Sequence, residues 1–163
     1  MARLFYILII LAACTGCGYY SFSGAGLVGI ETVYVPLFGN ATTEFGIEEQ
    51  LTDALVQAVN DERTLTYTQQ ENADAILRGR IIRVIDVPMT YTGQEEVRSF
   101  KVEVSAHVVF EDVENAKTIM EEDIVTYETY PYPEEPGNSR EQALNRALEK
   151  LANEIVNKAI TGW

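Results

Sequence analysis

The sequence predicts a two-layer α/β sandwich, with two helices packed on one face of a four-stranded sheet in the order β-α-β-β-β-α. Two segments repeat apolar residues at intervals of three and four, the period of one helix face. Four segments are rich in β-branched and aromatic residues, and the clearest of them alternates apolar and polar side chains over residues 100–111. Two amphipathic helices and a sheet with one polar face bury their apolar surfaces economically against each other.

The first strand is predicted over residues 30–38 (IETVYVPLF). Pro36 has no amide donor, so it ends this strand or lies at a sheet edge. A loop over residues 39–43 leads to the first helix, predicted over residues 45–61. The first turns of that helix are acidic, which the helix dipole favours.

The second strand is predicted over residues 73–87 and is ended by Pro88. Its alternation slips between Ile81 and Ile82, which indicates a bulge or burial of both faces. Residues 89–97 (MTYTGQEEV) are predicted to form a polar loop before the third strand.

The third strand is predicted to keep one largely polar face, and the chain then turns back into a fourth strand over about residues 118–130. A proline-rich loop follows. Ser139 and Gln142 form a capping box that begins the second helix, whose apolar side extends to Ala159.

Composition argues for one domain, over residues 30–163, and against several classes of function. The 163 residues include 12 basic and 25 acidic ones, for a net charge of −13. So acidic a chain repels phosphate backbones, and we expect no nucleic-acid partner. The single histidine, His107, is predicted on the polar face of the third strand, and no nucleotide-binding or hydrolase motif occurs. We therefore predict a protein that is not an enzyme, with no catalytic residues, no metal and no cofactor.

The N-terminus has the form of a signal peptide, residues 1–13, because one arginine precedes ten apolar residues. The stretch Leu11-Ala12-Ala13 before Cys14 resembles the lipobox of bacterial lipoproteins, in which the cysteine is acylated. Cys17 is the alternative lipid site, in which case the signal peptide extends to residue 16. With Cys14 as the lipid site, residues 14–29 form the lipidated N-terminus and tether. Neither cysteine is followed by aspartate, which points to the outer membrane.

Several stretches together resemble the LptE family of lipopolysaccharide-assembly lipoproteins. The resemblance covers nearly the whole mature chain. The mature N-terminus of the family often begins Cys-Gly followed by an aromatic residue, which also favours Cys17 as the acylated residue. The stretches are Cys17-Gly18-Tyr19, Val33-Tyr34-Val35-Pro36-Leu37-Phe38-Gly39-Asn40-Ala41-Thr42, Gly46-Ile47-Glu48-Glu49-Gln50-Leu51-Thr52-Asp53-Ala54-Leu55 and Ala73-Asp74-Ala75-Ile76-Leu77-Arg78-Gly79-Arg80-Ile81.

The resemblance implies a lipid-anchored protein on the periplasmic side of the cell outer membrane. Such a protein plugs the LptD β-barrel and assists assembly of lipopolysaccharide into the outer leaflet. Family members contact lipopolysaccharide through basic residues, and arginine bonds phosphate bidentately. Arg78 and Arg80 share one face by alternation, and Arg83 joins them only if the bulge near Ile82 forms. The implied phosphate contacts are Arg78, Arg80, Arg83, Arg98 and Lys101.

A second class of function stays open. Activators of peptidoglycan synthases and curli-secretion lipoproteins have similar first strands, which read V-x-P-F-x-N-x-T. A protein of that kind would bind an enzyme or oligomerise into a pore, and would not plug a barrel. Co-purification of a large outer-membrane barrel separates the two classes.

Overall fold

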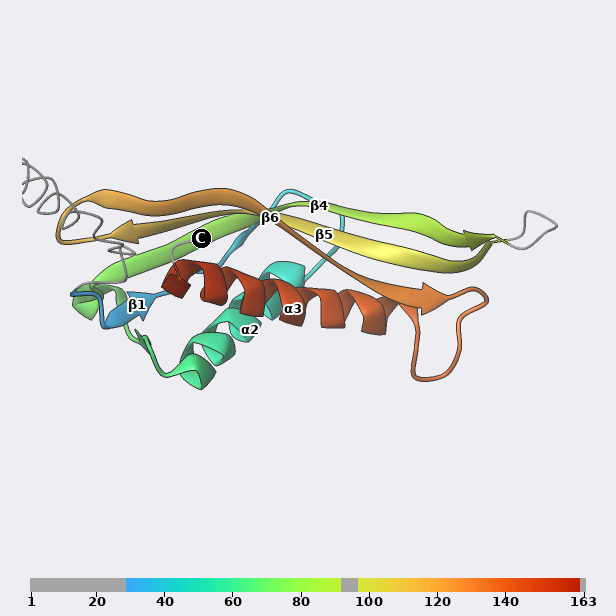
Figure 1. Ribbon diagram of the computed structural model, residues 1–163, viewed down its shortest axis with the longest axis horizontal. Coiled ribbons are helices and arrows are strands. Elements are labelled where there is room, and N and C mark those ends of the chain that lie inside the picture. The colour runs from blue at the N-terminus through green and yellow to red at the C-terminus, as the bar shows by residue number, and fades with distance from the viewer. Residues whose placement is uncertain (1–28, 92–96, 162–163) are drawn as a thin grey trace, which may run out of the picture.

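The computed structural model describes residues 29–91 and 97–161, in which two helices cover one face of a sheet (Figure 1). The predicted layers are therefore confirmed. The elements are β1 (Thr32–Tyr34), β2 (Gly39–Asn40), α2 (Ile47–Glu62), β3 (Thr66–Tyr67), a 3₁₀ turn (Gln70–Asn72), β4 (Ala75–Tyr91), β5 (Val97–Asp112), β6 (Lys117–Pro131) and α3 (Arg140–Thr161).

The sheet has six strands, so the prediction of four was wrong. Its order is β3-β1-β4-β5-β6, and β2 also pairs with β4. The long strands β4, β5 and β6 are antiparallel, whereas β1 and β2 run parallel to β4. The strands β2 and β3 have two residues each, too few to show an alternation. The strand predicted over residues 30–38 stops at Tyr34, two residues before the proline that cannot donate to a ladder.

Asp74 attaches the short strand β1 to the start of β4. Its carboxylate accepts hydrogen bonds from the backbone amides of Glu31 at 3.0 Å and Thr32 at 2.8 Å. The Thr32 hydroxyl lies 2.8 Å from the same oxygen, and this hydrogen bond is the first cause that lowers the pKa of Asp74. One side chain thus satisfies donors that a three-residue strand cannot pair by itself.

The predicted slip in β4 is a bulge. The pairing with β5 shifts between Ile81 and Arg83, so Ile82 is the extra residue and the alternation resumes one position later. The polar loop predicted over residues 89–97 is shorter than expected, because β4 continues to Tyr91 and β5 begins at Val97.

Both helices bury the apolar face that their spacing predicts. The capping box of α3 is confirmed: the Ser139 amide donates to Gln142 Oε1 at 3.1 Å, and the Gln142 amide donates to Ser139 Oγ at 3.3 Å. The largest fully buried core side chains are Phe38, Phe110, Leu51, Leu55, Leu77, Ile81, Leu148, Leu151, Ile155, Val33, Val59 and Val102.

The predicted signal peptide, both cysteines and nearly all of the predicted tether lie outside the described residues. The domain boundaries therefore stay predictions. Over residues 29–91 and 97–161, neither helix combines the length and the apolar character that crossing a bilayer requires.

Candidate functional site

The outer face, by which we mean the side of β4, β5 and β6 that the helices leave uncovered (Figure 1), collects most of the predicted cations. Arg78 and Arg80 point to it by alternation, opposite Val109 and His107 of β5. The bulge at Ile82 brings Arg83 to the same face. By alternation Lys101 joins the outer face. Arg98 is the extra residue at a further register shift, where Ser99 pairs with Thr90 and Val97 pairs with Tyr91, so alternation assigns it to neither face.

Three of these cations are neutralised by carboxylates on the same sheet. Arg78 Nε donates to Glu111 at 2.9 Å, and this hydrogen bond is the first cause that lowers the pKa of Glu111. Arg83 and Lys101 both bond Glu103, at 3.0 and 2.9 Å, and the lysine is the first cause that lowers the pKa of Glu103. The Arg78–Glu111 pair is exposed and contributes little stability, whereas the Glu103 side chain, which bonds Arg83 and Lys101, is only 16% exposed. All three cations are occupied by carboxylates.

Arg80 and Arg98 have no ion pair among the described residues. Arg80 lines a shallow hollow of about 440 Å³ on the outer face, together with His107. His107 lies on the outer face as predicted, with Nδ1 2.8 Å from Asp123 and Nε2 3.5 Å from Glu121. The outer face therefore offers one free guanidinium beside carboxylates, which suits a single phosphate better than a polyanion.

The outer face also carries two half-exposed apolar side chains on β6. Val125 and Tyr127 of β6 are 50% and 48% exposed. The ammonium groups of Lys101 and Lys150 lie 5.0 and 5.1 Å from the centre of the Tyr127 ring, within the range of cation–π attraction. Cations and apolar groups together suit an amphipathic ligand.

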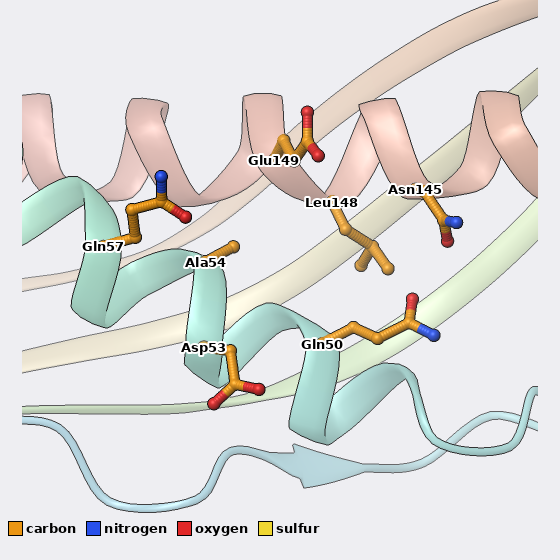
Figure 2. A pocket seen from close by; sticks show the side chains of 7 residues that line it. All are labelled: Gln50, Asp53, Ala54, Gln57, Asn145, Leu148 and Glu149. Carbon is orange, nitrogen blue, oxygen red and sulfur yellow. The ribbon is translucent and has the colours of Figure 1, made fainter.

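The opposite side of the molecule has a groove of about 340 Å³ between α2 and α3 (Figure 2). Amide and carboxylate side chains line it over a short apolar floor, and none of the lining residues is a cation. Its lining residues are Gln50, Asp53, Ala54, Gln57, Asn145, Leu148 and Glu149. The groove is a polar surface that accepts and donates hydrogen bonds.

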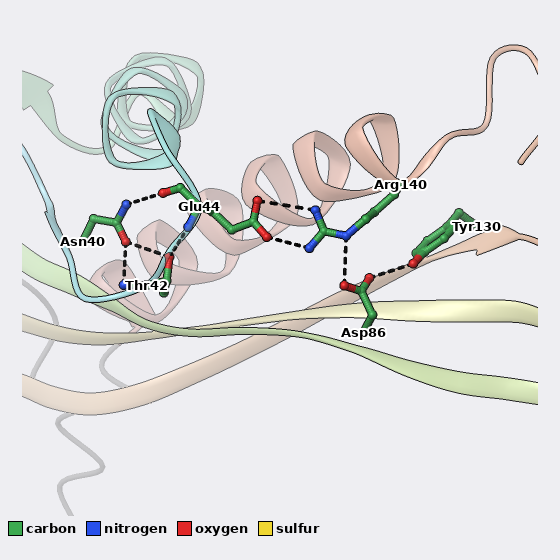
Figure 3. A network of polar contacts seen from close by, with 6 residues as sticks. All are labelled: Asn40, Thr42, Glu44, Asp86, Tyr130 and Arg140. Carbon is green, nitrogen blue, oxygen red and sulfur yellow. Dashed lines mark hydrogen bonds and ion pairs between the residues drawn. The ribbon is translucent and has the colours of Figure 1, made fainter.

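A polar network joins the loop before α2 to the first residue of α3 and to the sheet (Figure 3). Arg140 is at its centre, with Nη2 2.6 Å from Glu44 and Nε 2.9 Å from Asp86. Hydrogen bonding to Glu44 is the first cause that raises the pKa of Arg140. Asp86 also accepts from the Tyr130 hydroxyl at 2.8 Å, and burial, then this bond, raises the pKa of Tyr130 to about 12.

The segment Asn40-Ala41-Thr42, at the end of β2, has a structural role in the same network. Asn40 Oδ1 lies 2.9 Å from the Thr42 amide and 2.8 Å from its hydroxyl, and Asn40 Nδ2 donates to the Glu44 carbonyl at 2.7 Å. The segment therefore presents the Glu44 carboxylate to Arg140. No local pattern could reveal this contact, because the two residues are 96 positions apart.

The family model described as LptE, lipopolysaccharide assembly, matches residues 30–159 of this chain. The chain belongs to the LptE family. The resemblance noted in the sequence is thus confirmed. The LptE family is a family of outer-membrane lipoproteins, and the match supports an outer-membrane lipoprotein of the LptE-like fold for this chain. A comparison with curated proteins finds no match.

Solved structures similar to this LptE chain agree on the fold alone, because their sequence identities are low. The hypothetical protein CT253 from Chlamydia trachomatis matches at a TM-score of 0.59 and 9% identity, covering 79% of this chain and 95% of its own. Protein XCC0632 from Xanthomonas campestris matches at 0.57 and 12%, covering 82% and 85%. A dodecamer of a PelC variant from Paraburkholderia phytofirmans matches at 0.51 and 12%, covering 82% and 88%.

Proposed function

We propose that this LptE protein plugs an LptD-type β-barrel and assists assembly of lipopolysaccharide into the outer leaflet. The observation that carries the proposal is the family match over residues 30–159. The groove between the two helices adds support, because the lumen of an outer-membrane barrel is polar and this surface presents amides and carboxylates.

We also propose that Cys14, or alternatively Cys17, carries acyl chains that hold the protein at the periplasmic side of the outer membrane. Two or more acyl chains suffice for stable anchoring. The tether over residues 14–29 would then link the anchor to a single domain over residues 30–163. The mass of the N-terminal peptide decides which cysteine is acylated.

The same proposal includes contact between the outer face and the phosphates of lipopolysaccharide. Arg80 is the best candidate on that face, because Arg78, Arg83 and Lys101 each already bond a carboxylate. Arg98 is exposed and has no ion pair among the described residues, but it lies at an irregular position near the start of β5 and does not line the hollow. A phosphate at Arg80 has no competing ion pair to displace.

Replacing Arg80 with glutamine is expected to lower the lipopolysaccharide retained by the purified protein by about three- to ten-fold, since one charge-assisted bidentate contact is lost. Arg63→Gln is the matched control, because it removes the same guanidinium from an exposed site at the end of α2, which does not line the hollow. Bound lipopolysaccharide is quantified per protein. Equal retention by the two variants would remove Arg80 from the proposed contact.

The plug itself is tested by a mild-detergent pull-down from the membrane fraction through a C-terminal tag, with proteins identified by mass spectrometry. We expect a stoichiometric outer-membrane β-barrel. A peptidoglycan synthase or a homo-oligomer in its place would contradict the plug and support the alternative function.

A further inference from the structure

Phe45, on the loop between β2 and α2, is the most exposed large apolar side chain in the described part of the molecule, at 97%. An exposed phenylalanine does not contribute the burial by which such a side chain ordinarily stabilises a fold. Singly exposed apolar residues are common on proteins, so exposure alone assigns no role to this ring. Its local geometry distinguishes it.

The usual intramolecular role of an apolar residue at this position is missing. Gly46 is the N-cap of α2, so Phe45 is the residue before the cap. An apolar residue there often packs against the fourth helical residue in a hydrophobic staple. That residue is Gln50, which is polar and exposed. The ring therefore has no apolar partner on its own helix.

The backbone on the N-terminal side of the ring is held by the network of Figure 3. Glu44 is bonded through its carboxylate to Arg140 at 2.6 Å and through its carbonyl to Asn40 at 2.7 Å. Its amide donates to the Thr42 hydroxyl at 3.2 Å. On the other side, Gly46 has a φ of 75°, a left-handed conformation that glycine adopts without strain. A ring presented on so ordered a loop loses little conformational freedom on binding.

The charge around Phe45 indicates what could cover it. Glu48 and Glu49 occupy the first turn of α2, and among the described residues neither forms an ion pair; Glu48 accepts a hydrogen bond from the neutral Asn40 amide at 2.8 Å. The nearby guanidinium of Arg140 is already engaged by two carboxylates. An anionic lipid surface would be repelled by this rim. A protein pocket with an apolar floor and a rim of lysine and arginine complements it.

We propose that Phe45 is the anchor by which this protein docks into an apolar pocket, rimmed by lysine and arginine, on its barrel partner. Large aromatic side chains inserted in such pockets carry most of the energy of many interfaces. The inference rests on the proposed function for the identity of the partner. The exposed ring, the ordered loop and the acidic rim stand independently of it.

The test places a photoreactive phenylalanine analogue at position 45 of the tagged full-length chain and, as a control, at position 113. Val113 is a suitable control because it is 47% exposed and lies in the turn between β5 and β6. We expect one dominant crosslink from position 45 to the barrel, absent from position 113. The crosslinked peptide should contain apolar residues flanked by lysine or arginine.

Substitution gives the second readout. Phe45→Ala is expected to lower the amount of co-purified barrel about ten-fold or more, whereas Val113→Ala leaves it unchanged. Because the ring is almost fully exposed, Phe45→Ala should keep the unfolding midpoint of the wild type. Glu44→Gln loosens the loop but keeps the ring, so it should give a smaller loss. The double variant with Glu44→Gln and Phe45→Ala should retain as much barrel as Phe45→Ala alone, because the loop acts only by positioning the ring.

Each outcome decides between the two proposals. If the wild type retains the barrel but position 45 does not crosslink to it, the anchor is overturned and the plug stands. If no barrel is retained, the plug fails. The anchor then survives only if two results are obtained. One other protein must crosslink at position 45 through a segment that is apolar and flanked by lysine or arginine, and Phe45→Ala must lower the co-purified amount of that protein about ten-fold. Crosslinks to lipid alone, or no crosslink at all, overturn the anchor.

Discussion

Replacing Gly79 with alanine is expected to lower the free energy of unfolding by about 3 kcal/mol, as for an overpacked core. A Cβ at this position would lie 2.5 Å from the His107 carbonyl oxygen of β5 and 2.6 Å from Cε1 of Phe38. The oxygen belongs to the neighbouring strand of the ladder, and the Phe38 ring is 2% exposed. Neither atom can move away without a loss of hydrogen bonding or packing. Equilibrium urea unfolding measures the change.

Gly39→Ala is the matched control, because this glycine also lies in a strand next to β4. A Cβ there would meet only the side chain of Arg80, at 3.1 to 3.3 Å; its Cγ and Cδ can rotate away, and a shift of a few tenths of an ångström relieves the contact with its Cβ. We expect a change within about 1 kcal/mol. Losses of similar size for the two glycines would show that flexibility of glycine, and not the close approach of β5 and Phe38, sets the cost.

Replacing Arg140 with methionine is expected to cost about 2 kcal/mol of stability, between the values for exposed and buried ion pairs. The guanidinium bonds Glu44 and Asp86, whose side chains are 30% and 28% exposed. Methionine keeps the aliphatic length but leaves two partly desolvated carboxylates without a cation. The same urea unfolding experiment gives the change.

Arg146→Met on the same helix provides the comparison. Arg146 is 41% exposed and lies 4.0 Å from Glu128, with a hydrogen bond to Asn138 at 2.9 Å. We expect a loss below about 1 kcal/mol, because this pair is looser and more solvated. If the two substitutions lower the free energy of unfolding equally, the contact of Arg140 with both Glu44 and Asp86 has no special role in holding the loop.

Local patterns predicted what depends on neighbours along the chain. The apolar faces of both helices, the three long strands, the capping box at Ser139 and the slip at Ile82 all follow from periods and short motifs. The family resemblance also rests on such motifs, and the match over residues 30–159 agrees with it. The strands β2 and β3 were missed because two residues cannot display a period.

The candidate site was predictable only in part. The sequence by itself determined which cations exist and, by alternation, that Arg78 and Arg80 share a face. Tertiary structure decided that carboxylates engage Arg78, Arg83 and Lys101, and that Arg80 has no ion pair within the described part of the chain. Strand register selects the partners of Arg78 and Arg83. Tertiary structure also decided the exposure of Phe45, because a ring is buried or presented according to what the chain packs beside it.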